Sequence, residues 1–171
     1  MIEQILLEES YPYPNNVLPA MLYPDAFKNI VEEHHAAEQV IERLARYQYT
    51  NAWVNGIFDY HHFHSNADEV LVCLAGEASV QLGGPSGKKV SFTQGDVLLL
   101  PPGMAHKRLK ASKDFSIVGA YPNGQSFNTY KKSDVKSKEL FGKIKEEISH
   151  VAIPPLDPVQ GDKGAIHTYW K

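Results

Sequence analysis

The sequence predicts an all-β domain, a sandwich or a barrel, from two observations between residues 49 and 122. Apolar residues in this stretch come in short runs, such as residues 70–75 and 97–100. Turn-forming residues, for example Gly83-Gly84 and Gln94-Gly95-Asp96, interrupt these runs. Short strands separated by turns about every ten residues are typical of sandwiches and barrels. With 43% hydrophobic residues, a chain of 171 residues can bury the core that such a fold needs.

The first 48 residues are expected to form an extended arm followed by a helix. Four prolines lie between residues 8 and 24 and favour an extended chain, because proline fixes φ and lacks an amide hydrogen. After them, Asp25 is a candidate N-cap. Residues with helical spacing then predict one stripe packed on the body of the protein. These residues are Phe27, Ile30, Val31, His34, Ile41 and Leu44.

Residues 123–171 predict a mixed extension, with a short helix around residues 138–148 and a proline-rich stretch at 154–158. No repeat or low-complexity tract divides the chain. We therefore expect a single domain over residues 1–171. It would comprise an arm and helix (1–48), a β core (49–122) and a C-terminal extension (123–171).

Composition argues against two classes of partner. A net charge of −3 provides no basic surface for nucleic acid or for an anionic membrane. The longest apolar runs are too short to cross a bilayer. The acidic N-terminus lacks the basic region and apolar core of a signal peptide, and Cys73 is the only cysteine, so no intrachain disulfide can form. These features predict a cytoplasmic protein.

The segment from Gly56 to Glu69 is the one richest in possible metal ligands. On a strand, alternate side chains share a face, so His62 and His64 would point the same way. Glu69 would begin the next strand, and His106 could come from a third. Three imidazoles and a carboxylate suit iron, manganese, nickel, cobalt or zinc. Strand histidines are also common as core or surface residues, so these residues alone leave both interpretations open.

Two patterns in this region resemble the motifs of the cupin family. The first, G-x5-H-x-H-x4-E-x6-G, is matched by Gly56, His62, His64, Glu69 and Gly76. The second, G-x5-P-x-G-x2-H-x3-N, is matched by Gly95, Pro101, Gly103 and His106. Its last position holds Lys110 in place of asparagine, which bears on local packing and pocket charge rather than on metal ligation.

This resemblance implies a double-stranded β-helix, the cupin jelly-roll barrel, with an N-terminal helix and a mixed C-terminal tail. It implies one divalent transition metal (Fe, Mn, Ni or Zn) bound by His62, His64, Glu69 and His106. Residues 114–125 and 157–161 also resemble an uncharacterised bacterial single-domain cupin group. Membership of that group would join the helix and the tail to the barrel, but would supply no substrate.

Four further residues are candidates for a substrate pocket. Trp53 and Asn55 precede the first motif and, two residues apart, would point to the same face of a strand, where they could line the pocket. Aromatic residues in barrels, however, often only fill the core. Arg108 and Lys110 follow His106 with inward parity and could meet a substrate carboxylate or phosphate. The alternative for this pair is a solvated strand end.

Two classes of function are compatible with the sequence. The first is a small-molecule metalloenzyme, with dioxygenase chemistry as the leading hypothesis and metal-dependent isomerase or lyase chemistry behind it. The second is a non-catalytic cupin that binds a small molecule or sugar. The resemblance also implies a homodimer, in which the arm at residues 8–24 could cover a sheet edge of the neighbour.

Overall fold

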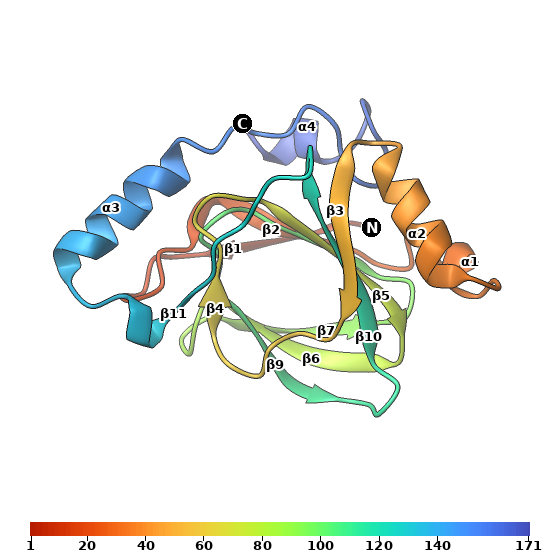
Figure 1. Ribbon diagram of the computed structural model, residues 1–171, viewed down its shortest axis with the longest axis horizontal. Coiled ribbons are helices and arrows are strands. Elements are labelled where there is room, and N and C mark those ends of the chain that lie inside the picture. The colour runs from red at the N-terminus through yellow and green to blue at the C-terminus, as the bar shows by residue number, and fades with distance from the viewer.

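The computed structural model describes the whole chain, Met1 to Lys171, and strands dominate it (Figure 1). The strands are β1 (Glu3–Leu7), β2 (Asn16–Tyr23), β3 (Tyr49–Asn55), β4 (His62–Phe63), β5 (Glu69–Ala75), β6 (Glu77–Leu82), β7 (Lys88–Thr93), β8 (Val97–Leu100), β9 (His106–Ala111), β10 (Ser116–Pro122) and β11 (Tyr130–Lys131). The helices are α1 (Lys28–Val31), α2 (Ala36–Ala45), the 3₁₀ helix η1 (Lys132–Asp134), α3 (Lys138–Ser149) and α4 (Ile166–Tyr169). The strands form two antiparallel sheets, so the predicted β fold is confirmed at this level.

The six-stranded sheet has the order β1-β2-β8-β5-β10-β3 and is covered on both faces. In β5, Val70 and Val72 belong to the hydrophobic cluster that includes Leu44 of α2. The alternate residues Leu71 and Cys73 belong to a second cluster on the opposite face. This alternation follows from the two-residue period of a strand and explains why β5 is apolar almost throughout.

The five-stranded sheet has the order β11-β4-β9-β6-β7, and the second cluster lies between it and the six-stranded sheet. Val80 and Leu82 of β6 are buried in this cluster, whereas Gln81 between them is only partly buried. Strand pairing runs within each sheet, so the structure has two facing sheets rather than the closed barrel that we predicted.

The N-terminal region differs from the prediction, because two strands precede the first helix. The proline-rich arm contributes β2, which pairs with β1 and with β8 of its own chain. The arm is therefore extended as predicted, and within the chain it joins the six-stranded sheet. The predicted homodimer stays a prediction.

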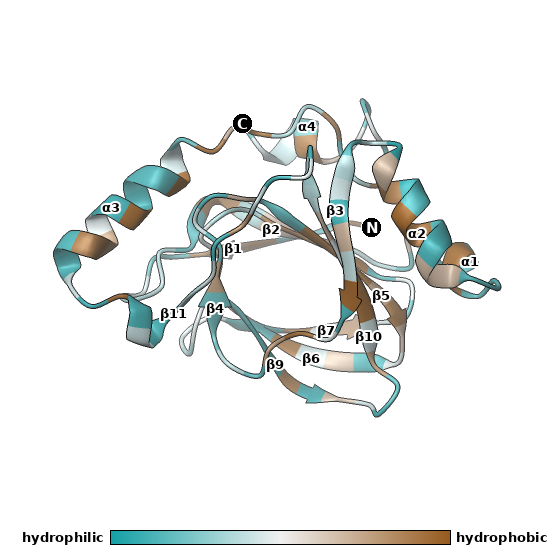
Figure 2. Ribbon diagram, in the orientation of Figure 1, coloured by the Kyte–Doolittle hydropathy of each residue, from teal (hydrophilic) through white to brown (hydrophobic).

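The predicted N-terminal helix is divided into α1 and α2, which pack together on one side of the molecule (Figure 1). Asp25 is not a cap: it has a positive φ of 56°, and Phe27 precedes α1 without a side-chain cap. His35 directly precedes α2 and has a left-handed conformation with a φ of 58°, so one continuous helix cannot run through it. Figure 2 shows that α2 carries both hydrophobic and hydrophilic residues, and its buried residues are Val40 and Leu44.

The C-terminal extension holds α3 and then returns to the six-stranded sheet. Ser137 caps α3 by accepting a hydrogen bond from the Leu140 amide at 3.1 Å. Ile144 and Ile148 of α3 pack in a third cluster with Phe63 of β4. No helix of the structure combines the length and the apolar composition that crossing a membrane requires.

Candidate metal centre

Three histidines meet where β4 and β9 pair. His62 stands directly opposite His106 in this ladder, and their ring centroids are 4.0 Å apart. His64, two residues after His62, adds a third imidazole. One ring nitrogen from each of the three buried histidines lies within 4.8 Å of the other two, so together they could hold a metal ion.

The fourth predicted ligand comes from the other sheet. Glu69 is the first residue of β5 and is only 3% exposed. Its Oε1 lies 3.4 Å from His64 Nε2 and 3.3 Å from His106 Nε2. The structure therefore brings all four residues together, and this cluster bridges the two sheets at one end of the space between them.

Backbone carbonyls fix the orientation of each imidazole. The Nδ1 of His62 contacts the Tyr60 carbonyl at 3.0 Å, and that of His106 contacts the Met104 carbonyl at 3.0 Å. The Nδ1 of His64 contacts the Asn128 carbonyl at 2.5 Å. Because a carbonyl can only accept, each Nδ1 carries a proton, so that any of these rings in its neutral form has its lone pair on Nε2, free for a metal ion. Metal-ligating histidines are commonly oriented in this way.

A hydrogen-bonded chain holds the carboxylate of Glu69. The Tyr121 hydroxyl donates to Glu69 Oε2 at 2.7 Å, and the indole Nε1 of Trp53 donates to the same hydroxyl at 2.7 Å. One carboxylate oxygen is thereby occupied by Tyr121, and the other faces the histidines.

The electrostatics of the cluster favour an ionised glutamate. Burial alone would raise the pKa of Glu69, but the charge of His64 and the hydrogen bonds from His106 and His64 lower it well below its usual range. Burial, and then the charge of His106, lower the pKa of His62 to about 3. Burial lowers the pKa of His64, yet Glu69 outweighs it and leaves this pKa raised. The cluster thus favours a positive charge beside Glu69.

These residues fit a divalent transition metal. Donor atoms each about 2.1 Å from one ion, at angles of roughly 90–110°, lie roughly 3.0–3.4 Å apart. The two distances from Glu69 Oε1 to His64 Nε2 and His106 Nε2, 3.4 Å and 3.3 Å, fall in this range. Three imidazole nitrogens and one carboxylate oxygen are a donor set that suits such ions.

A cavity of about 190 Å³ opens over this cluster. All four predicted ligands line it, and so do Trp53 and Asn55. Its remaining lining residues are Gly56, Ile57, Phe58, Leu71, Tyr121, Phe127 and Thr129. Phe127 stacks on Tyr121 with centroids 4.5 Å apart, which makes one wall flat and aromatic.

Arg108 and Lys110 do not line the cavity. The β6–β9 register shifts between Ser79 and Val80, so Arg108 pairs with Val80, but Lys110 pairs with Ser79. This bulge reverses the alternation of β9, and Lys110 is exposed. Arg108 lies before the bulge, so the alternation predicted for β9 still holds at this residue. Its guanidinium lies 3.9 Å from the carboxylate of Asp59.

Sequence reasoning did not find Tyr121, Phe127 or Thr129. They follow the second motif by more than ten residues, and no spacing rule connects them to the histidines. The run of aromatic and polar residues from 121 to 130 was the available signal, since such a run is unusual for a solvated loop.

Comparison with known proteins identifies the class of this protein. Residues 53–114 match the Cupin domain family, and the geometry above places both cupin motifs at one centre. The chain belongs to the cupin family. Within it, the chain is 33% identical over 144 residues to the uncharacterised protein YjlB of Bacillus subtilis (strain 168). This match covers 84% of the chain and 83% of YjlB.

Several solved structures resemble parts of the chain. The TDP-quinovose 3,4-ketoisomerase WlaRB from Campylobacter jejuni is 16% identical with a TM-score of 0.42, over 55% of this chain and 75% of that one. Acireductone dioxygenase from Bacillus anthracis is 17% identical with a TM-score of 0.38, over 61% of this chain and 72% of that one.

Proposed function

We propose that this cupin binds one divalent transition metal, iron, manganese, nickel or zinc, through His62, His64, Glu69 and His106. The observation that carries the proposal is the convergence of one ring nitrogen from each of the three buried histidines within 4.8 Å, with Glu69 Oε1 3.4 Å from His64 Nε2 and 3.3 Å from His106 Nε2. A buried cluster of this kind has its ligands oriented before the ion arrives, which favours tight binding.

The bound ion would supply Lewis-acid activation of a small molecule or, as iron, activation of dioxygen. The chain supplies the surroundings. Tyr121 holds one oxygen of Glu69, so that the other stays directed at the histidines. Phe58 and Phe127 add apolar surface to the wall of the cavity.

The walls of the cavity indicate the class of substrate. A volume of about 190 Å³ is below the range of about 300–1,000 Å³ of pockets for drug-sized ligands, so the substrate is a small molecule. No lysine or arginine lines the cavity, which argues against a phosphorylated or polyanionic substrate. The stacked Tyr121 and Phe127 favour a flat apolar group, and Asn55 and Thr129 offer hydrogen bonds to one polar end.

Oxygen-dependent oxidation is the reaction that these residues support best. Isomerases and lyases need a side chain that moves a proton to or from carbon. The titratable residues lining the cavity are the four proposed ligands and Tyr121. Burial, and then the charge of Glu69, raise the pKa of Tyr121 far above neutrality, so this phenol stays protonated. Chemistry centred on the metal needs no separate base.

Elemental analysis of protein purified without a metal-affinity tag tests the metal site. We expect about one iron or manganese per chain in the native protein, and loss of this metal in His106→Ala. The control is His34→Ala, which removes an exposed histidine distant from the cluster and should retain the metal. An absence of stoichiometric metal after anaerobic reconstitution with Fe(II) would contradict the proposal.

Oxygen consumption by the iron-loaded protein tests the reaction. The panel should contain small planar molecules with adjacent oxygen atoms, and matched phosphorylated compounds as controls. Consumption stimulated by an uncharged member supports the proposed class. Turnover without oxygen would instead identify an isomerase or lyase, and saturable binding without turnover would identify a binding protein.

The predicted homodimer is tested separately. Light scattering at several protein concentrations distinguishes the two states, because a homodimer has twice the mass of the monomer. A monomer at every concentration would contradict this prediction.

A further inference from the structure

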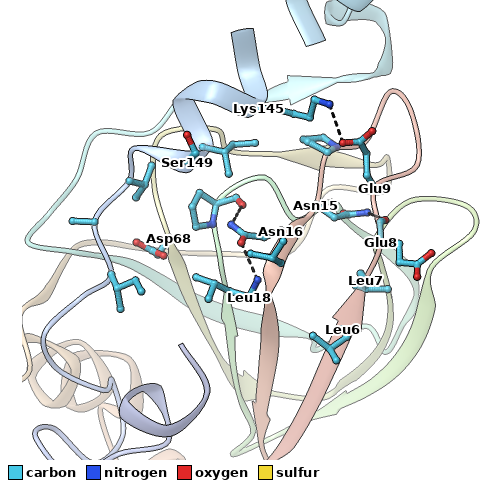
Figure 3. Close-up of a pocket in the computed structure, with 17 residues that line it drawn as sticks. Leu6, Leu7, Glu8, Glu9, Asn15, Asn16, Leu18, Asp68, Lys145 and Ser149 are labelled. Atoms are coloured by element: carbon cyan, nitrogen blue, oxygen red, sulfur yellow. Dashed lines mark hydrogen bonds and ion pairs between the residues drawn. The ribbon is translucent and has the colours of Figure 1, made fainter. Parts of the chain in front are cut away.

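A second and larger cavity, of about 820 Å³, lies between β1, β2 and the chain that follows α3 (Figure 3). It shares no lining residue with the cavity over the metal centre. Its volume lies within the range of about 300–1,000 Å³ that is usual for small-molecule sites. The proposed metal chemistry makes no use of this cavity.

Apolar side chains from both ends of the sequence form much of the wall of this cavity. The N-terminal strands contribute Leu6, Val17 and Leu18, and the C-terminal segment contributes Ile148, Val151 and Ile153. Leu6 and Val17 are 60% and 91% exposed, so burying them against a ligand would be favourable.

The amide side chains in the wall are already hydrogen-bonded within the protein. Asn16 donates to the Pro102 carbonyl at 2.8 Å and accepts from the Leu18 amide at 2.9 Å. Asn15 donates to two carbonyls and accepts from the Ala105 amide at 3.1 Å. These groups fix the wall and leave little capacity for a ligand.

Asp68 is different, because its carboxylate is buried without a full set of partners. The residue is 1% exposed and lines the cavity, and its Oδ2 has no hydrogen-bond partner. Figure 3 shows Asp68 beside the C-terminal segment, near Leu18 and well away from Glu8 and Glu9. Buried polar atoms are nearly always paired, so an unpaired carboxylate oxygen in a cavity wall indicates a missing donor.

The charged residues that line the cavity are mostly acidic, which favours a cationic ligand. Its charged lining residues are Glu8, Glu9, Asp68 and Lys145. Lys145 is already paired with Glu9, whose Oε1 lies 3.1 Å from its Nζ (Figure 3). The carboxylates of Glu8 and Asp68 therefore remain without a cationic partner among the lining residues.

We propose that this second cavity is a binding site for a small organic cation, a primary amine with an apolar body. The ammonium group donates to Asp68, and the apolar body lies against Leu18 and Ile153. An ammonium is the donor that suits this carboxylate, because charge-assisted hydrogen bonds are stronger than neutral ones. The apolar walls explain why an organic amine fits this site better than a hydrated metal ion.

Calorimetry at pH 8 with three probes of one shape tests this site. The probes are phenethylammonium, the neutral 2-phenylethanol and the anion phenylacetate. We expect phenethylammonium to bind at least about tenfold more tightly than the alcohol, and phenylacetate not to bind. In Asp68→Asn, which keeps the shape but removes the charge, the affinity for the amine should fall to that of the alcohol.

Two controls locate the binding. Ile153→Trp, at a partly exposed position, should fill the cavity and weaken both the amine and the alcohol while leaving Asp68 in place. Protein stripped of metal with a chelator should bind phenethylammonium as the untreated protein does, because the two cavities are separate. The folded state of each variant is checked by circular dichroism.

Three outcomes would overturn the proposal. Equal affinity for amine and alcohol would mean that Asp68 does not select a cation. Amine binding that survives both Asp68→Asn and Ile153→Trp would place the amine elsewhere. Absence of binding, together with a dimer that Ile153→Trp dissociates, would show that a second copy of the chain covers the cavity instead.

Discussion

Asp68 and Glu69 are neighbours in the sequence, equally buried, and in opposite electrostatic situations. Glu69 faces three imidazoles and accepts a hydrogen bond from Tyr121, and its pKa is lowered. Asp68 lines a different cavity with no partner on Oδ2, and burial raises its pKa to about 7. The exposed fractions, 1% and 3%, do not distinguish the two residues.

The comparison shows that burial alone does not determine the state of a carboxyl group. Desolvation by itself would raise the pKa of both carboxyl groups. At Asp68 it determines the final pKa, because too few hydrogen-bond donors are present to oppose it. At Glu69 the surrounding donors outweigh it. One cavity is therefore arranged around a stable anion, and the other contains a carboxyl group without a partner, which ionises only above about neutral pH.

Exchanging each carboxylate for its amide gives the sharpest test. Glu69→Gln should reduce metal affinity by more than about 100-fold, because an amide is a poorer ligand and leaves the histidines without their anionic partner. Asp68→Asn should change metal affinity by less than about twofold, since this residue faces the other cavity. Metal titration in the presence of a competing chelator measures both values. Similar losses in the two variants would refute the separation of the two sites.

Asp68 should contribute to the pH dependence of stability, in the direction opposite to His62, whose lowered pKa makes stability rise with pH between about 3 and 6.5. Between the ordinary pKa of Asp68, 3.8, and its folded value of about 7, the folded state holds a proton that the unfolded state has released. The contribution of Asp68 to stability therefore falls as the pH rises through this window, by up to about 4 kcal/mol. In urea unfolding of the metal-free protein, Asp68→Asn should remove this fall, so that stability rises more steeply with pH in the variant than in the wild type. A variant profile parallel to the wild-type one would contradict the assignment.

Tyr121 should matter for the metal through Glu69. Tyr121→Phe removes the hydroxyl that donates to Glu69 at 2.7 Å and should lower metal affinity by about 10–100-fold. Tyr130→Phe is the matched control, because Tyr130 stacks on Phe63 and does not line the metal cavity. If both variants bind metal equally well, the hydrogen bond does not support the site.

The smallest effect is expected at Lys110. Lys110→Ala should change metal affinity and oxygen-dependent turnover by less than about twofold, because the bulge in β9 turns this residue away from the cavity. Asn55→Ala, at a position that does line the cavity, should raise the KM for a substrate while leaving the metal bound. Steady-state kinetics on the two variants measure both effects. A similar rise in KM in both variants would contradict the assignment of Lys110 to the outside of the cavity.

The sequence predicted the candidate ligands because their spacing is local or defined by a motif. His62 and His64 share a face by strand alternation alone, and the ladder of β4 and β9 places His106 opposite His62. The same parity rule predicted an inward Lys110 and was wrong there, since one inserted residue reverses alternation beyond it. Glu69, Leu71 and Cys73 alternate along β5 in the same way, and Leu71 and Cys73 lie in the cluster between the sheets.

Other features depended on contacts between distant segments. Nothing near Asp25 in the sequence shows that its amide is bound by Asp96 at 2.9 Å, which replaces the predicted cap. The prolines of the arm excluded a helix but could not show which sheet edge β2 would join. Tyr121 reaches Glu69 across 52 residues of sequence, a distance over which periodicity carries no information.

The sequence by itself determined the class of this protein: short strands, two cupin motifs, and four residues of the right chemistry for one metal. These properties reside in strand period and motif spacing, which act over a few residues. Only the tertiary structure decided that Tyr121 and Trp53 support Glu69, and that Asp68 opens into a separate cavity. Such relations arise when two sheets and both chain ends pack together, because desolvation and pairing depend on every group that surrounds a side chain.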